Sequence, residues 1–134
     1  MFSITVEIGD DLVAPIYNHV HHGKCFFLLE RARVGLLEAI GFPNEQLLRE
    51  GKVLVITQVN VAYRREVKAG VVTVTCDSVR YEDRVIRIHQ RIINSRGKTA
   101  VEGEVSSMFM DMNSRRGMDA PQDFLAALLK ASGS

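Results

Sequence analysis

The pattern of hydrophobic and polar positions divides the chain into a strand, a loop, a helix and a run of four strands. Residues 2–8 (FSITVEI) alternate between apolar and polar positions and are rich in β-branched side chains, which predicts a strand. Residues 9–23 contain Gly, Asp, Pro and Asn and are expected to form a long loop. Four further strands are joined by short sequences typical of hairpin turns, which predicts a meander: 53–67, 70–81, 84–94 and 99–112.

Residues 24–40 are the most apolar stretch and are predicted to be a helix that ends at Gly41, just before Pro43. At 100° per residue, the main apolar stripe comprises Phe26, Leu29, Leu36, Leu37 and Ile40, with Cys25, Leu28 and Ala32 beside it and Phe27 and Val34 outside it. A helix that is apolar on more than one side is expected to be enclosed by other structure. Shorter helices are predicted over 44–50 and after Pro121.

One apolar helix combined with five antiparallel strands predicts an α+β fold in which the sheet curls around the helix. A length of 134 residues suits a single domain over 1–134. A hydrophobic content of 46% with 25% charged residues is ordinary for a globular protein and does not change this picture.

Composition and charge exclude several functions. A net charge of +1 provides no broad positive field, which argues against nucleic acid as a partner. Cys25 and Cys76 lack metal-ligand spacing and are interpreted as buried thiols in a reducing compartment. With no apolar run of 18 residues and no basic leader, we expect neither a membrane span nor a signal peptide, and a cytoplasmic location.

The segment HVHHGKCFFLLERAR (19–33) resembles the helix-entry motif of hotdog-fold acyl-CoA thioesterases, the 4-hydroxybenzoyl-CoA thioesterase-like family. That motif reads Asp, three spacers, His-Val-Asn-Asn, two residues and an aromatic, and it closes with Leu-Glu and Ala-Arg. Here His19 and Val20 keep its first half, His21 and His22 replace the two asparagines, and Cys25 replaces the aromatic. Segments 58–76 and 110–128 resemble later parts of the family, so the resemblance covers nearly the whole chain.

This resemblance implies a hotdog fold, a five-stranded antiparallel sheet wrapped around one central helix. It also implies hydrolysis of an acyl thioester to a free acid and a thiol, with acyl-CoA or acyl carrier protein as the carrier, in fatty acid metabolism and without a cofactor. Proteins of this kind form dimers, often tetramers, with active sites at the subunit boundary. One departure concerns the family's catalytic Asp, which falls on Pro15, while Asp11 lies slightly upstream.

Thioester hydrolysis needs donors for the carbonyl oxygen, and the N-terminus of the predicted helix provides free N–H groups and a favourable dipole. Gly23 either lets a substrate approach this backbone or simply allows the turn into the helix. Candidates to activate or hold water are Asp11, Asn18, His19 and Glu30, and Tyr17 is a candidate donor to the thioester.

The histidines admit two interpretations. His19 matches the family's His, and it either acts in the chemistry or shapes the loop by hydrogen bonding. His22 is a candidate substrate contact or a solvent-facing residue. Because no matching carboxylate or cysteine accompanies the cluster, we expect no metal site.

Basic residues supply the last candidates. Arg33 falls inside the apolar stripe, so it must pair with a carboxylate, with backbone carbonyls, across a subunit boundary or with substrate; Glu30 is a candidate partner. Tyr63, Arg64 and Arg65 lie at a predicted strand end and are candidate substrate contacts. Five further basic residues lie in predicted turns or nearby: Lys68, Arg96, Lys98, Arg115 and Arg116. These basic residues, with Arg64 and Arg65, either bind CoA phosphates or an acidic carrier protein, or are solvated turn residues.

Two alternative functions remain open at this point. The absence of a carboxylate at Pro15 motivates a non-catalytic hotdog protein that binds acyl thioesters. Another hotdog chemistry, the dehydration of hydroxyacyl thioesters, requires a His–acid pair across the subunit boundary.

Overall fold

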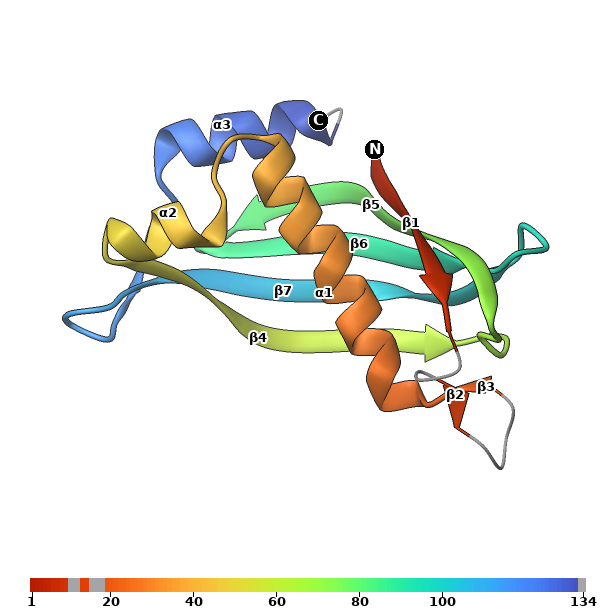
Figure 1. The fold of residues 1–134 in the computed structure, drawn as a ribbon. Helices are drawn as coiled ribbons and strands as arrows, with labels where there is room; N and C mark the ends of the chain where they lie inside the picture. Colours follow the sequence, from red (N-terminus) through yellow and green to blue (C-terminus); the bar gives the residue numbers. More distant parts are fainter. Residues whose placement is uncertain (10–12, 15–18, 133–134) are drawn as a thin grey trace.

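The computed structural model describes residues 1–9, 13–14 and 19–132, and for Ala14 and His19 only the backbone. Helix α1 lies across one face of a strongly curved sheet (Figure 1). The elements in chain order are β1 (Phe2–Ile8), β2 (Val13–Ala14), β3 (His19–Val20), α1 (His22–Ala39), α2 (Asn44–Arg49), β4 (Lys52–Tyr63), β5 (Gly70–Glu82), β6 (Val85–Ile93), β7 (Thr99–Asp111), β8 (Gly117–Met118) and α3 (Gln122–Ala131).

The main sheet has the order β1-β5-β6-β7-β4 with antiparallel neighbours, and the short β8 pairs with β7. This confirms the predicted α+β hotdog arrangement around one helix. Strands β5, β6 and β7 form a meander, but the prediction that β4 joins it is wrong, because β4 pairs with β7. Strand β4 ends at Tyr63, four residues earlier than predicted, since the N–H groups of Arg64 and Arg65 turn to donate to the Ala100 carbonyl at 2.7 and 3.1 Å.

The segment before α1 contains more structure than the predicted loop. Strands β2 and β3 form a small antiparallel pair. Helix α1 begins at His22, two residues earlier than predicted, because the Nδ1 atom of His21 accepts a hydrogen bond of 3.1 Å from the Gly23 N–H. It ends at Ala39, and Gly41 follows with φ of +88°, the left-handed conformation that stops a helix.

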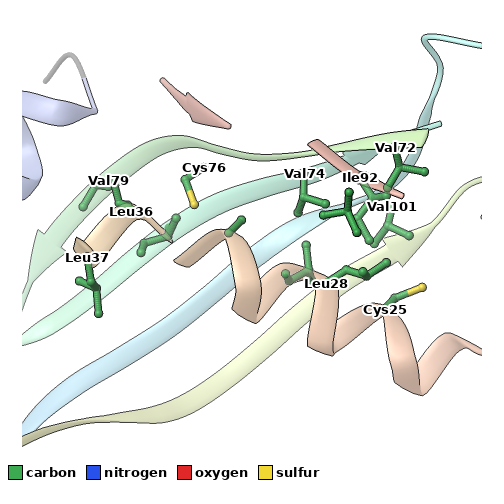
Figure 2. Close-up of a cluster of buried hydrophobic side chains, with 14 of the residues drawn as sticks. Cys25, Leu28, Leu36, Leu37, Val72, Val74, Cys76, Val79, Ile92 and Val101 are labelled. Carbon is green, nitrogen blue, oxygen red and sulfur yellow. The ribbon is translucent and has the colours of Figure 1, made fainter. Parts of the chain in front are cut away.

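The core lies between α1 and the concave face of the sheet (Figure 2). Its side chains include Cys25, Leu28, Leu36 and Leu37 of α1, Val72, Val74, Cys76 and Val79 of β5, Ile92 of β6 and Val101 of β7. The buried side of α1 is rotated relative to the predicted stripe, because the helix packs mainly against β5, β1 and β6. Phe26, expected in the stripe, is therefore exposed on the side that faces β4.

Helix α3 closes the end of the fold away from the first turn of α1 (Figure 1). The Phe124 ring packs edge-on against Phe109 and Phe42, with centroids 4.9 and 5.4 Å apart. The Ala120 N–H donates to the Tyr81 hydroxyl at 2.9 Å, which fixes the approach to the helix. Within the described residues, the helices lack the length and apolar character needed to cross a membrane.

Candidate active site

A cleft of about 320 Å³ opens beside the first turn of α1. Strand β4 ends at Tyr63, and the segment that follows it is held beside β3 by the bond from the Val20 N–H to the Val67 carbonyl. Its lining residues are Val20, His22, Cys25, Tyr63, Arg64, Arg65, Glu66, Val67 and Val101. The cleft thus brings together four sequence-predicted candidates that lie about 40 positions apart in the chain, namely His22 and the run from Tyr63 to Arg65.

Two hydrogen bonds tie the first turn of α1 to the segment after β4. The Tyr63 hydroxyl donates to the His22 carbonyl at 3.0 Å, and the Tyr63 ring meets the His22 ring edge-on. On the other side, the Val20 N–H donates to the carbonyl of the buried Val67 at 2.6 Å. Burial raises the pKa of Tyr63 above its ordinary value, which is consistent with its hydroxyl acting as a donor here.

The N–H groups of the first turn are not equivalent. The Gly23 N–H is occupied by the His21 imidazole, and the Lys24 N–H donates to the His21 carbonyl at 2.9 Å. Within the part of the chain that the structure describes, no hydrogen-bond partner faces the N–H of His22, the first residue of the helix and a lining residue of the cleft. Among the described residues, the His22 N–H rather than that of Gly23 is therefore the donor of this turn without a partner.

Gly23 itself does not line the cleft. Its backbone is helical, and a Cβ added there would meet only the His21 ring, at 3.4–3.6 Å. The turn into α1 therefore does not require a glycine at this position.

Glu66 is the one carboxylate among the described lining residues, and the sequence analysis missed it. Its side chain is exposed, and its Oε2 atom lies 3.9 Å from the Lys68 ammonium. The neighbouring arginines are engaged elsewhere, because Arg64 pairs with Glu102 at 3.2 Å and Arg65 donates to the Thr99 carbonyl at 2.9 Å. The sequence signal that could have identified Glu66 is the adjacent Val67, a single apolar residue in a charged run, which indicates that the segment packs against the core.

Both cysteines are buried thiols. Cys25 lies in the wall of the cleft but is buried, and burial raises the pKa of its thiol to about 11. Burial likewise raises the pKa of Cys76 to about 12. Both are free and buried, as the sequence predicted. In the described ranges, no three His, Cys, Asp or Glu side chains gather in a way that would hold a metal ion.

The other predicted site residues are either outside the described part of the chain or lie elsewhere on α1. Asp11, Tyr17 and Asn18 lie outside the described residues, and His19 is described only as backbone in β3. Glu30 and Arg33 lie further along α1 and line two grooves of about 260 and 170 Å³ between α1 and β4.

The partner of Arg33 is Gln90, and the prediction of Glu30 as its partner is wrong. The Arg33 Nη1 atom donates to the Gln90 Oε1 atom at 2.9 Å, and the Gln90 Nε2 atom donates to the Leu29 and Thr75 carbonyls at 3.0 and 3.2 Å. Gln90 is only 1% exposed, so this amide links the helix, β5 and β6 within the core. Burial lowers the pKa of Arg33, and the nearby Cys76 and Glu30 act in the opposite direction.

The side of α1 that faces β4 carries an exposed apolar surface, which we name the α1–β4 face. Four large side chains of this face are 40–63% exposed: Phe26, Phe27, Ile56 and Val59. Strand β4 is at the edge of the sheet, so one side of its backbone is unpaired among the described residues.

Comparisons with known proteins agree with this fold. The model of a family described as the thioesterase-like superfamily matches residues 6–128. A hypothetical protein from Staphylococcus aureus, solved in complex with CoA, aligns with a TM-score of 0.89 and 18% identity over 98% of this chain and 84% of that chain. A 1,4-dihydroxy-2-naphthoyl-CoA thioesterase from Synechocystis aligns with a TM-score of 0.86 and 10% identity over 95% and 94%. No curated protein matches the sequence.

Proposed function

We propose a specific activity for this chain, which belongs to the thioesterase-like superfamily: the hydrolysis of an acyl-CoA, or of an acyl carrier protein thioester, to a free acid and a thiol. The observation that carries the proposal is the cleft at the first turn of α1, which is lined by His22, Tyr63 and Glu66 and where the His22 N–H has no partner among the described residues. The CoA complex of one structural neighbour and the naphthoyl-CoA thioesterase activity of another support a CoA thioester as substrate.

The first step of this reaction is binding of the thioester carbonyl. The carbonyl oxygen accepts a hydrogen bond from the His22 N–H at the positive end of the helix dipole. Attack at the carbonyl carbon places negative charge on this oxygen, so the donor stabilises the tetrahedral intermediate more than the bound substrate. Because Tyr63 holds the His22 carbonyl, the adjoining backbone is fixed before the substrate arrives.

The second step requires a base, and we assign this role to Glu66. Its carboxylate takes a proton from water, the oxygen of that water bonds to the carbonyl carbon, and the C–S bond breaks. The thiolate that leaves takes up the proton, which yields the free acid and the thiol. Asp11, His19 and Asn18 remain candidates for the same role from the segment before α1.

Release of free thiol from a panel of acyl-CoAs, followed with a thiol reagent, tests the proposal. The wild-type protein is expected to turn over several substrates, and Glu66→Gln to lower kcat by about 100-fold or more with little change in KM. The control is Glu102→Gln, which removes a neighbouring carboxylate that is paired with Arg64 and does not line the cleft.

Two other results distinguish the alternatives. Full activity in Glu66→Gln together with a large loss of activity in Asp11→Asn would identify Asp11, and not Glu66, as the base. Saturable binding of acyl-CoA without any turnover supports a non-catalytic binding protein, the function that Pro15 favours.

We further propose that a second copy of the chain covers the α1–β4 face. An edge strand of 12 residues flanked by exposed aromatic and aliphatic side chains is a surface that stable proteins pair or cover. Glu30 and Arg33 lie on this face with opposite charges, so a two-fold interface can place each against its counterpart in the other copy. Light scattering after size-exclusion chromatography is expected to give about 30 kDa, twice the 15.0 kDa of one chain, or a multiple of it. A 15 kDa species at micromolar concentration contradicts this assembly.

A further inference from the structure

The residue that caps α1 is a histidine, and both its ring and its backbone accept hydrogen bonds from the first turn of the helix. The His21 Nδ1 atom accepts from the Gly23 N–H at 3.1 Å, and the His21 carbonyl accepts from the Lys24 N–H at 2.9 Å. The backbone of His21 is not helical, with φ of −59° and ψ of 137°. Both bonds bridge over His22, the first residue of the helix.

The ring bond defines the protonation state of His21. A backbone N–H can only donate, so Nδ1 carries no proton, and the neutral ring holds its proton on Nε2. The usual caps are Ser, Thr, Asp and Asn, which accept through an oxygen that remains an acceptor around neutral pH. A protonated imidazole has no acceptor, because both of its nitrogens then donate. The His21 cap therefore exists only while the ring is neutral.

The groups around the cap do not hold a charged ring in place. An imidazolium over Gly23 lies at the positive end of the helix dipole, and it stacks on the His22 ring with centroids 4.2 Å apart. The other charged or titratable groups of the described elements at this turn are Lys24, Cys25, Tyr63, Arg64, Arg65 and Glu66. The described side chains of β2 and β3 are apolar. Glu66 is the one carboxylate of this set, and its described ion-pair partner is Lys68.

The cap bears on the candidate active site because it fixes the direction of the His22 N–H. This N–H belongs to the peptide group between His21 and His22, so its direction follows from the ψ angle of His21. The ring bond to Gly23 holds that angle from one side of the peptide. On the other side, the Tyr63 hydroxyl holds the His22 carbonyl at 3.0 Å. Release of the ring therefore frees one of the two restraints on the donor that we assign to the thioester carbonyl.

We propose that His21 is a positioning residue for thioester hydrolysis: its neutral ring directs the His22 N–H into the cleft, and protonation of the ring releases it. The inference rests on the proposed function and deepens it, because it makes the same site sensitive to pH. The protonated protein behaves as a protein without the cap. Activity therefore falls as the ring becomes charged toward acidic pH, and it returns when the ring is neutral.

Kinetics of three variants test this role. At pH 8, His21→Ala is expected to lower kcat about tenfold with little change in KM, while His21→Asn, which keeps an oxygen acceptor, stays within about threefold of wild type. Between pH 8 and pH 5.5, wild-type kcat is expected to fall about fivefold, and that of His21→Asn less than about twofold. The matched control is His89→Gln, which removes a histidine that contacts Asp77 on the outer face of the sheet and is expected to keep the wild-type profile.

The Gly23 amide provides a readout that needs no substrate. In NMR spectra of the isotope-labelled full chain at pH 8, the His21 Nδ1 signal is expected to be that of an unprotonated nitrogen. As the pH falls, the Gly23 amide shift is expected to change with the same midpoint as the His21 ring, and the protection of this amide from hydrogen exchange to fall about tenfold. In His21→Asn this step is expected to be absent.

Four results overturn the inference. They are a protonated Nδ1 in His21 at pH 8, a Gly23 amide that does not titrate with His21, a wild-type kcat at pH 8 in His21→Ala, and an acid-side loss of kcat in His21→Asn equal to that of wild type. The amide titration is measured without turnover. Absence of turnover with an intact titration therefore overturns the proposed function, whereas turnover without the titration overturns the role of His21 alone.

Discussion

The Tyr63 hydroxyl donates a hydrogen bond of 3.0 Å to the carbonyl oxygen of His22 and so joins the end of the edge strand to the first turn of the central helix. The N–H of the same residue, His22, is the donor we assign to the thioester carbonyl. Tyr63 is therefore a positioning residue, which acts on the reaction through the backbone it holds.

Removing this hydroxyl is expected to reduce activity more than stability. In Tyr63→Phe, the ring still lines the cleft, but the first turn of α1 loses its tether, so kcat falls about tenfold with a small change in KM. Steady-state kinetics and thermal unfolding of the same preparation measure both effects. Tyr81→Phe is the control, since it removes a hydroxyl that holds Ala120 far from the cleft and is expected to affect only stability. Unchanged kcat in Tyr63→Phe argues against the positioning role.

Cys25 is expected to take no part in the chemistry although it lines the cleft. With a pKa of about 11, roughly one thiol in ten thousand is ionised at pH 7. Cys25→Ala is therefore expected to retain activity within about threefold per folded molecule, the residual effect coming from lost packing. Iodoacetamide at pH 7.5 is expected to leave the wild-type activity intact. Rapid alkylation with parallel loss of activity would identify a reactive thiol instead.

The partly buried Arg33–Gln90 pair is expected to stabilise the fold as a unit. Gln90→Met removes the acceptor of a partly buried guanidinium and is expected to destabilise the protein by about 2–4 kcal/mol. Adding Arg33→Met is expected to restore part of this loss, because the unpaired charge is removed as well. Urea unfolding of the single and double variants measures the coupling, with the exposed Arg31→Met as control. Strictly additive losses contradict direct pairing.

The sequence predicted the fold well because its main signals are local. Alternation in β1 and in β5–β7 and the apolar run of α1 depend on neighbouring residues, and these elements appear within about two residues of their expected bounds. The partner of Arg33 could also have been predicted from the alternation of polar and apolar residues, because Gln90 lies on the apolar face of β6 between Ile88 and Ile92. It is the polar position on a buried face, and such positions identify buried hydrogen-bond networks.

The parts that could not be predicted depend on contacts between distant segments. Strand β4 pairs with β7 rather than β5, and two of the six residues that connect β4 to β5, Arg64 and Arg65, donate to the Ala100 carbonyl of β7, a contact that no local pattern reveals. Glu66 likewise enters the cleft only because this connection folds against Val20. Which N–H of the first turn remains available depends on the His21 ring, whose capping role is a matter of side-chain geometry.

A pH-dependent contribution to stability is expected from Asp77 on the outer face of the sheet. Burial acts to raise its pKa, but the two hydrogen bonds from Arg91, at 2.7 and 2.9 Å, contribute to a net lowering. Because the pKa is lower in the folded state, the ionised carboxylate stabilises the protein fully at pH values above the unfolded pKa of about 4. This stabilisation is lost as the pH falls through the lower pKa of the folded state.

Thermal unfolding of wild type and Asp77→Asn between pH 7 and pH 3 checks this sign. The difference in Tm is expected to be constant above about pH 5 and to shrink below pH 4. Asp119→Asn, which breaks the exposed pair with Arg84, is expected to give a difference near zero throughout. A difference for Asp77→Asn that grows toward low pH contradicts the assignment.

The most direct test of the proposed site is a crystal structure with a non-hydrolysable acyl-CoA analogue in which a methylene group replaces the thioester sulfur. The ketone oxygen of the analogue is expected to lie about 3 Å from the His22 nitrogen, within hydrogen-bond distance, with the Glu66 carboxylate facing the carbonyl carbon. A ketone oxygen more than about 4 Å from that nitrogen, or an acyl group bound with its carbonyl in the grooves beside Arg33, would contradict the site.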